Sequence, residues 1–141
     1  MNKKMTAEEL CGIIAKAKTL FMATVDGDQP KSRPISGHFI DGDKVIFGVG
    51  GFKNVYRQLA ANPKLEFVGL YDGVKWLRLT GRAVFDDGAE REAHQEKMLE
   101  TLPFLRKIYN GETGNKLMTF HLEDATAEIV IFMPPGETFA L

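Results

Sequence analysis

The strongest constraint on the fold is a pair of strand-like segments joined by a two-residue turn. The segments LEFVGLY (65–71) and VKWLRLTGRAVF (74–85) flank Asp72-Gly73, a dipeptide typical of tight β-hairpins. Residues alternate along the longer segment. One face is apolar, with Leu77, Leu79, Ala83 and Phe85, and the other carries Trp76, Arg78, Thr80 and Arg82. A strand with only one face in the core is typical of a barrel wall.

Further short apolar runs predict more strands. Apolar runs separated by two Asp-Gly-Asp turn signals predict strands at 20–25, 30–40 and 44–49, which would form an antiparallel meander. The segment 116–133 predicts two more strands around a turn at Glu123-Asp124. The 141 residues therefore fit one α+β domain (1–141), an antiparallel barrel of six to seven strands.

Helical spacing of apolar residues predicts three helices that flank this barrel. The first covers 6–17, where Thr6 and Glu9 have the form of a capping box. The second runs from Phe52, with Phe52 on its apolar face, to a stop at Asn62-Pro63, and the third covers 89–102.

Composition excludes several classes of function. The chain has 18 Lys and Arg against 19 Asp and Glu, whereas proteins that bind nucleic acid usually carry a basic excess. No apolar run approaches the ~20 residues of a membrane helix, and the basic N-terminus lacks the apolar stretch of a secretory signal. The single cysteine, Cys11, excludes an internal disulfide. We therefore expect a cytoplasmic protein without nucleic-acid or membrane partners.

A glycine-rich segment offers a candidate anion site. Gly48-Val49-Gly50-Gly51 leads into the second helix, whose free N-terminal N–H groups attract anions. Lys53 lies in the first turn, where the helix dipole disfavours a cation unless an anion is bound beside it. The alternative is a tight turn that contains glycines, with Lys53 in solvent. The residues alone leave both interpretations open.

Ser32-Arg33-Pro34-Ile35 is the second candidate. A proline inside a strand marks an edge, a bulge or a place where a ligand approaches the backbone. Arg33 can form a bidentate contact with a phosphate. Taken alone, however, Arg33 is interpreted as a surface arginine on an edge strand.

No other motif predicts a catalytic or metal site. His38, His94 and His121 lie on different elements without metal-ligand spacing, and His94 is expected in solvent on its charged helix. No close pair of carboxylates and no Ser/His/Asp set is visible. A redox cofactor can carry such a reaction itself, so the lack of a nucleophile or general base does not argue against an enzyme.

Three segments taken together resemble a known family. FMATVDGDQPKSRPISG, KVIFGVGGFKNVYRQLAANPKLEF and WLRLTGRAVF resemble the pyridoxamine 5′-phosphate oxidase-like FMN-binding split-barrel superfamily, in its nitroimidazole-reductase-like branch, over residues 7–133. The resemblance implies a split barrel and a homodimer that binds FMN at the subunit interface. It also implies a flavin-binding set, which comprises Arg33, Pro34, Ile35, Ser36, Gly48, Val49, Gly50, Gly51, Lys53, Asn54, Trp76 and Arg78.

The resemblance implies a role for each part of this set. Arg33 and Lys53 would bind the FMN phosphate, the backbone at 34–36 would line the flavin ring, and 48–51 would wrap the ribityl chain. Trp76 and Arg78 would cover the flavin from the partner chain. The alternative for Trp76 is that the helix at 89–102 folds over it within one subunit.

Two departures from the family narrow the expected function. Many members have Thr or Ser where this chain has Val49, and the oxidase's C-terminal substrate-phosphate segment has no counterpart, so we do not expect the vitamin B6 oxidase itself. The expected activity is FMN-dependent reduction of a small planar acceptor such as a nitroaromatic or quinone. Two alternatives are a flavin-binding redox sensor or store without turnover, and a relative that binds heme or a deazaflavin.

Overall fold

The computed structural model describes residues 3–141. The helices are α1 (Ala7–Ala17), α2 (Asn54–Ala61) and α3 (Gly88–Thr101), followed by the 3-10 helix η1 (Pro103–Lys107). The strands are β1 (Lys3–Lys4), β2 (Leu20–Asp26), β3 (Gln29–Ile35), β4 (His38–Asp41), β5 (Lys44–Gly50), β6 (Lys64–Tyr71), β7 (Lys75–Phe85), β8 (Leu117–Ile131) and β9 (Glu137–Ala140). No helix within this range combines the length and the apolarity needed to cross a membrane.

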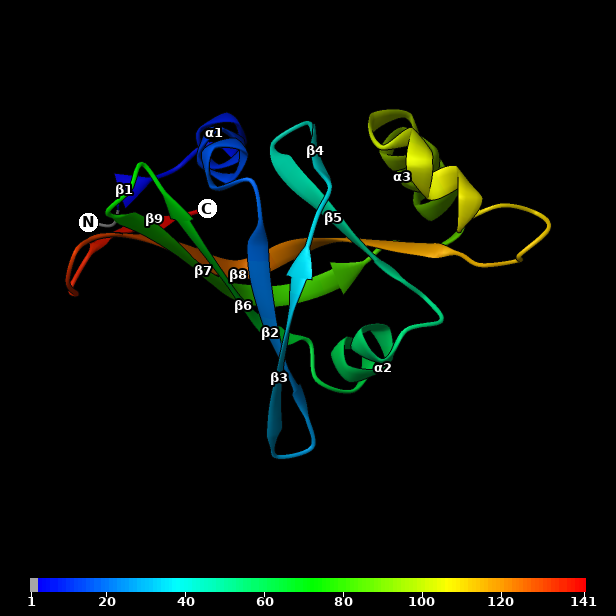
Figure 1. Cartoon of the computed structure of the whole chain (residues 1–141), viewed down its shortest axis with the longest axis horizontal. Helices are drawn as coiled ribbons and strands as arrows, with labels where there is room; N and C mark the ends of the chain where they lie inside the picture. The colour runs from blue at the N-terminus through cyan, green and yellow to red at the C-terminus, as the bar shows by residue number, and fades with distance from the viewer. Residues whose placement is uncertain (1–2) are drawn as a thin grey trace.

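The strands form a barrel that is split along one side. Hydrogen-bonded ladders connect β5, β8, β7, β6, β2 and β3 in that order, with all these pairs antiparallel. Among the described strands β3 and β5 share no ladder, so they are the two edges of the split. β4 pairs with β5, and the short β1 and β9 extend the sheet beyond β8 (Figure 1). The predicted α+β split barrel with flanking helices is confirmed.

The β6–β7 hairpin forms at the predicted place, with a turn one residue longer than expected. Leu70 pairs with Trp76 and Tyr71 with Lys75, so Asp72, Gly73 and Val74 make a three-residue turn. Asp72 and Gly73 have φ values of 48° and 77°, in the left-handed region that hairpin turns commonly use. The predicted inner-face residues Leu77, Leu79 and Ala83 are buried.

The predicted strand at 30–40 is in fact two strands with different partners. β3 pairs with β2, whereas β4 pairs with β5, so the predicted meander is wrong at this point. Gly37 separates them with φ of 94°, a conformation that side chains other than glycine rarely adopt. A Cβ at Gly37 would also lie 2.7 Å from the Leu102 side chain at the end of α3. The break at Gly37 opens the split in the barrel.

The prediction of two strands at 116–133 is also wrong. β8 is one long strand whose two halves both pair with β7, with a register shift opposite Thr80 and Arg82. Asp124, with φ of 51°, lies at this irregularity. The turn signal at Glu123-Asp124 therefore produces a bulge that curves the strand instead of reversing it.

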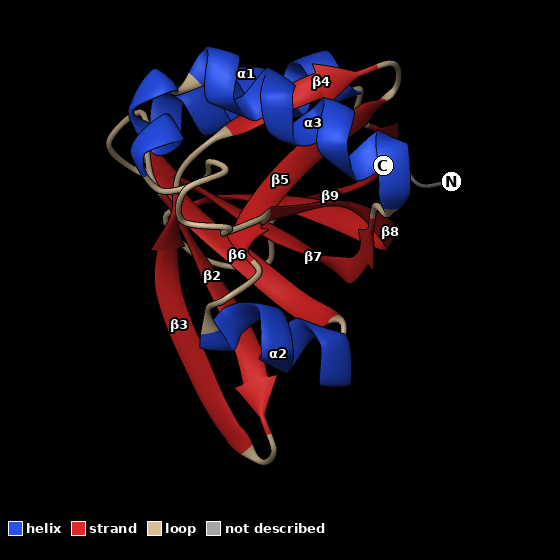
Figure 2. Ribbon diagram, turned by 90° about the vertical axis from the view of Figure 1, so that its right-hand side faces the viewer, coloured by secondary structure: helices blue, strands red, loops and turns tan. Residues whose placement is uncertain are grey.

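Aromatic side chains fill the barrel and helices cover its ends. Phe47 and Phe67 stack with ring centroids 4.7 Å apart, and Phe120 packs beside Phe47 at 5.7 Å. α1 packs on this core, while α3 and η1 cover a smaller cluster around Ile46. α1 and α3 lie at one end of the molecule with β4, and α2 lies at the other, next to β2 and β3 (Figure 2).

Candidate functional site

A pocket of about 140 Å³ lies in the split between β3 and β5, and we call it the split pocket. Predicted flavin-binding residues line it from both edges of the barrel: Arg33, Pro34, Ile35, Ser36, Gly48, Val49, Gly50 and Lys53. Its remaining wall was not predicted from the sequence and consists of Val55, Met98, Leu105, Tyr109 and Leu117. Because α3 and η1 contribute part of this wall, the charged third helix also shapes the site.

The glycines of the segment 48–51 serve protein packing and do not form a free loop. β5 continues to Gly50, and a Cβ at Gly50 would lie 2.8 Å from the Tyr109 hydroxyl. A Cβ at Gly51 would lie 3.0 Å from the Met118 side chain, and Gly51 N–H donates to the Lys116 carbonyl at 2.9 Å. Side chains and the α2 N-terminus therefore remain the principal donors for an anion here.

A second recess, which we call the cation recess, adjoins the split pocket. It has a volume of about 510 Å³ and shares four residues with that pocket, so the two are continuous. The lining residues are Asp26, Lys31, Arg33, Pro34, Lys53, Asn54, Val55 and Gln58. Asp26, the acidic residue among them, pairs with Arg57 at 3.4 Å. The recess therefore presents a net positive charge.

Lys53 and Asn54 lie where α2 begins. The helix starts at Asn54, with Lys53 as its capping residue, and its first turn contains no acidic side chain. Phe52 precedes the helix and is 55% exposed, so its predicted place on the apolar face is wrong. Within residues 3–141 no carboxylate oxygen lies within 4.0 Å of the Lys53 ammonium group. Lys53 and the helix N-terminus thus remain available to an anion.

Arg33 points inward from the β3 edge and contacts neutral acceptors. Its Nη1 donates to Thr24 Oγ1 at 2.7 Å and to the Met22 carbonyl at 3.2 Å. Its Nη2 donates to Gln58 Oε1 at 2.9 Å. Burial lowers the pKa of the Arg33 guanidinium. An arginine side chain nevertheless stays protonated in proteins. Arg33 is therefore an ordered cation within the site, in contrast to the surface arginine that its local sequence favours.

Trp76 and Arg78 lie on the outer face of β7, away from the split pocket. The Arg78 guanidinium carbon lies 4.8 Å from the centre of the Trp76 ring and also pairs with Glu66 and Glu128. α3 packs on β4, β5 and β8, beyond the far end of β7, so it does not fold over Trp76 (Figure 1). Gly51 lies in a separate recess beside Phe52. One chain alone therefore does not bring these three predicted residues to the pocket.

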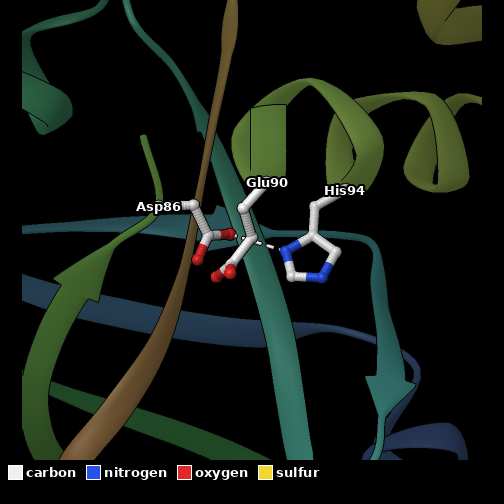
Figure 3. Close-up of side chains that lie close together, drawn as sticks. All are labelled: Asp86, Glu90 and His94. Atoms are coloured by element: carbon white, nitrogen blue, oxygen red, sulfur yellow. Dashed lines mark hydrogen bonds and ion pairs between the residues drawn. The ribbon is translucent and has the colours of Figure 1, made fainter. Parts of the chain in front are cut away.

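A cluster of titratable groups lies on the other side of α3. His94 is only 7% exposed, so its predicted place in solvent is wrong. Its two ring nitrogens lie 2.7 Å from carboxylate oxygens of Asp86 and Asp41. Glu90 approaches Asp86 from the same helix as His94 (Figure 3). Asp86 and Glu90 thus form a close carboxylate pair, which was not predicted from the sequence.

Hydrogen bonds determine the charges in this cluster. Burial alone would lower the pKa of His94, but hydrogen bonds to Asp86 and Asp41 outweigh it and hold the pKa above its ordinary 6.5. Burial would likewise raise the pKa of Asp86, but hydrogen bonds with His94 and Thr119 outweigh it and lower the pKa. Asp86, Glu90 and His94 also each place one potential metal-ligand atom within 4.8 Å of the others. A protonated His94, which carries a hydrogen on each ring nitrogen, already accounts for both short contacts.

Comparison with known proteins identifies the family. The family model described as pyridoxamine 5′-phosphate oxidase matches residues 6–127, and none of the curated proteins compared with the chain matches it. A NimC/NimA family protein from Clostridium acetobutylicum is 29% identical, with a TM-score of 0.81 over 95% of this chain and 91% of that one.

Two more distant structures share the fold. A pyridoxamine 5′-phosphate oxidase-related, FMN-binding protein from Nostoc punctiforme is 14% identical, with a TM-score of 0.65 over 94% of this chain and 87% of that one. A heme-binding protein from Mycobacterium smegmatis is 17% identical, with a TM-score of 0.70 over 98% and 59%. From the match of the family model and the likeness to the NimC/NimA protein, the chain belongs to the pyridoxamine 5′-phosphate oxidase-like superfamily, in its nitroimidazole-reductase-like branch.

Proposed function

We propose that the protein binds FMN across the split pocket and the cation recess. The observation that carries this proposal is the set of cations there. Within residues 3–141 neither Arg33 nor Lys53 has a carboxylate partner within 4.0 Å, and Lys31 lines the same recess. A phosphate monoester would neutralise this charge. The two volumes together lie within the roughly 300–1,000 Å³ typical of ligand pockets.

The lining residues suit the two halves of a flavin mononucleotide. Arg33 and Lys53 would hold the phosphate, while Ile35, Val49 and Leu117 offer an apolar wall for a flat ring. Flavin, when bound, supplies the electron-transfer chemistry, so the chain need not provide a nucleophile or general base. We therefore propose a flavin-dependent oxidoreductase that reduces a small planar acceptor of nitroaromatic or quinone type.

The absorption spectrum of the purified protein tests the cofactor. We expect the near-ultraviolet and blue absorption bands of an oxidised flavin, because the site favours a phosphorylated ring compound. Cofactor released by heat should co-migrate with FMN on chromatography. A Soret band, FAD, or no binding after reconstitution with FMN would each contradict the proposal. Steady consumption of a reduced nicotinamide with a nitro acceptor distinguishes an oxidoreductase from a flavin store.

We further propose that two chains associate through the outer face of β2, β6 and β7. Phe21 is 50% exposed and Leu70 is 67% exposed, and Leu70 pairs with Trp76 across the ladder. Phe21 pairs with Pro34 of the split pocket, so a partner on this face would border the candidate site. Exposed apolar residues around a tryptophan and an arginine are typical of protein interfaces. Such a homodimer would place the partner's Trp76 near the flavin.

Sedimentation tests the homodimer. The wild-type protein is expected to sediment as a dimer at micromolar concentration, and the double substitution Phe21→Asp/Leu70→Asp should yield monomers because it buries two carboxylates in an apolar contact. FMN affinity should fall with dissociation. Phe104→Asp is the matched control, since Phe104 is also exposed but lies on η1. A monomeric wild-type protein with flavin still bound would contradict both the dimer and the role of Trp76.

A further inference from the structure

A buried polar network lies directly behind Arg33. Thr24, 2% exposed, donates its hydroxyl hydrogen to Gln58 Oε1 at 2.7 Å, and Gln58 is itself only 4% exposed. Thr24 Oγ1 and Gln58 Oε1 both accept hydrogen bonds from the Arg33 guanidinium. Each residue belongs to a different element, with Thr24 on β2, Arg33 on β3 and Gln58 on α2. The network therefore connects the β3 edge of the split to the helix that begins beside Lys53.

The acceptors in this network leave the charge of Arg33 intact. Partly buried arginines are usually paired with carboxylates, which satisfy the guanidinium and also neutralise it. Here a hydroxyl, an amide oxygen and the Met22 carbonyl satisfy it without negative charge. Their hydrogen bonds offset the desolvation that lowers the pKa of Arg33. The full positive charge thus remains for a group in the cation recess.

The network also sets the orientation of the guanidinium. Arginine has only donors, so Gln58 must present its carbonyl oxygen to Arg33 and cannot rotate its amide without losing two hydrogen bonds. All three hydrogen bonds to this network use the Nη atoms of Arg33. The Nε–H group and the second N–H group of Nη2 are therefore not engaged by the network. An ordered side chain loses less conformational entropy when it binds a ligand.

We infer that Gln58 and Thr24 are positioning residues that hold Arg33, fully charged and correctly oriented, for the phosphate group of the bound nucleotide. This inference rests on the proposed FMN site. It predicts that substitutions of either residue reduce the contribution of the phosphate group to FMN affinity. The contribution of the flavin ring should stay unchanged. The ratio of riboflavin and FMN dissociation constants measures the phosphate contribution, because riboflavin lacks the phosphate.

The experiment measures both dissociation constants by quenching of flavin fluorescence with the full-length apoprotein. Gln58→Glu introduces a carboxylate that would neutralise Arg33, and Gln58→Leu removes its acceptor. Each should weaken FMN binding about tenfold to a hundredfold, the range for a hydrogen bond to a charged group, and leave riboflavin binding within about twofold of wild type. Gln95→Glu is the matched control, because Gln95 also accepts a hydrogen bond from an arginine, Arg91, but does not line the split pocket. The substitution keeps the acceptor oxygen for the Leu117 N–H group.

A second pair of variants keeps the test decisive if a Gln58 variant fails to fold. Thr24→Val removes the hydroxyl at nearly constant volume and should weaken FMN binding several-fold, whereas Thr24→Ser retains the hydroxyl and should restore it. An unchanged FMN preference in the folded variants, or an equal loss for FMN and riboflavin, overturns the inference. A wild-type protein without preference for FMN over riboflavin overturns the proposed phosphate site itself.

Discussion

Replacing Arg33 and Lys53 together by alanine is expected to weaken FMN binding at least a hundredfold. Each charge-assisted contact to a phosphate contributes about 1.5–3 kcal/mol, so the loss of two such contacts gives a factor of roughly 10²–10⁴. The fold should persist, because Lys53 is exposed and Thr24 and Gln58 retain the hydrogen bond between them. Fluorescence titration of the apoprotein measures the affinity, and circular dichroism checks the fold.

Two comparisons make this prediction specific to the phosphate. Riboflavin affinity should change little in the double variant, since the missing contacts involve only the phosphate group. The pair Lys16→Ala/Arg106→Ala serves as the control: it removes the same net charge from exposed ion pairs elsewhere on the surface. Wild-type FMN affinity in the Arg33/Lys53 variant would show that the phosphate lies elsewhere.

Local sequence signals predicted most elements of the fold correctly. Thr6 Oγ1 accepts the hydrogen bond from the Glu9 N–H group at 3.1 Å, as the capping-box pattern of α1 predicts. The Asp72-Gly73 hairpin and the alternation along β7 also match the structure. These features depend on neighbours within a few residues, which a pattern in one sequence can report.

The two wrong strand predictions arise where contacts between distant residues determine the backbone conformation. Gly37 breaks the predicted strand because the end of α3 packs against it, some sixty residues later in the chain. The bulge near Asp124 depends on the partner strand β7, where Gly81 faces Ala125 closely. Neither contact leaves a periodic signal, and both alter how the strands pair.

Only part of the candidate site was predicted from the sequence, because the rest depends on distant contacts. The family resemblance identified Arg33 and Lys53, but residues from α3, η1 and β8 reach the split pocket only through the tertiary fold. Gln58 did leave a signal, because it lies between Val55 and Leu59 on the apolar face of α2. A polar residue at such a position indicates a buried hydrogen bond. His94 gave no such signal on a helix rich in charged residues.

Replacing His94 by leucine is expected to destabilise the protein by about 3–5 kcal/mol, the cost of breaking a buried ion pair. The substitution leaves the Asp86 carboxylate buried with Thr119 as its remaining close donor, at 2.6 Å. For a chain of this size the loss lowers the melting temperature by about 10–17 °C. The double variant Asp86→Leu/His94→Leu should recover part of this stability, because it no longer buries an unpaired charge. Unfolding of the apoprotein in urea measures these differences.

The destabilisation should also depend on pH, with a sign that follows from the two pKa shifts. The pKa of His94 is raised in the folded state, so its stabilising contribution is complete below its ordinary pKa of 6.5 and is lost as the pH rises through the raised value. The pKa of Asp86 is lowered from 3.8, so its contribution is present above that pH and is lost as the pH falls further. The stability difference between wild type and His94→Leu should therefore be largest between about pH 4 and 6.5 and should shrink toward alkaline pH. A difference that stays constant from pH 5 to about pH 9 would mean that His94 is not protonated between its two carboxylates.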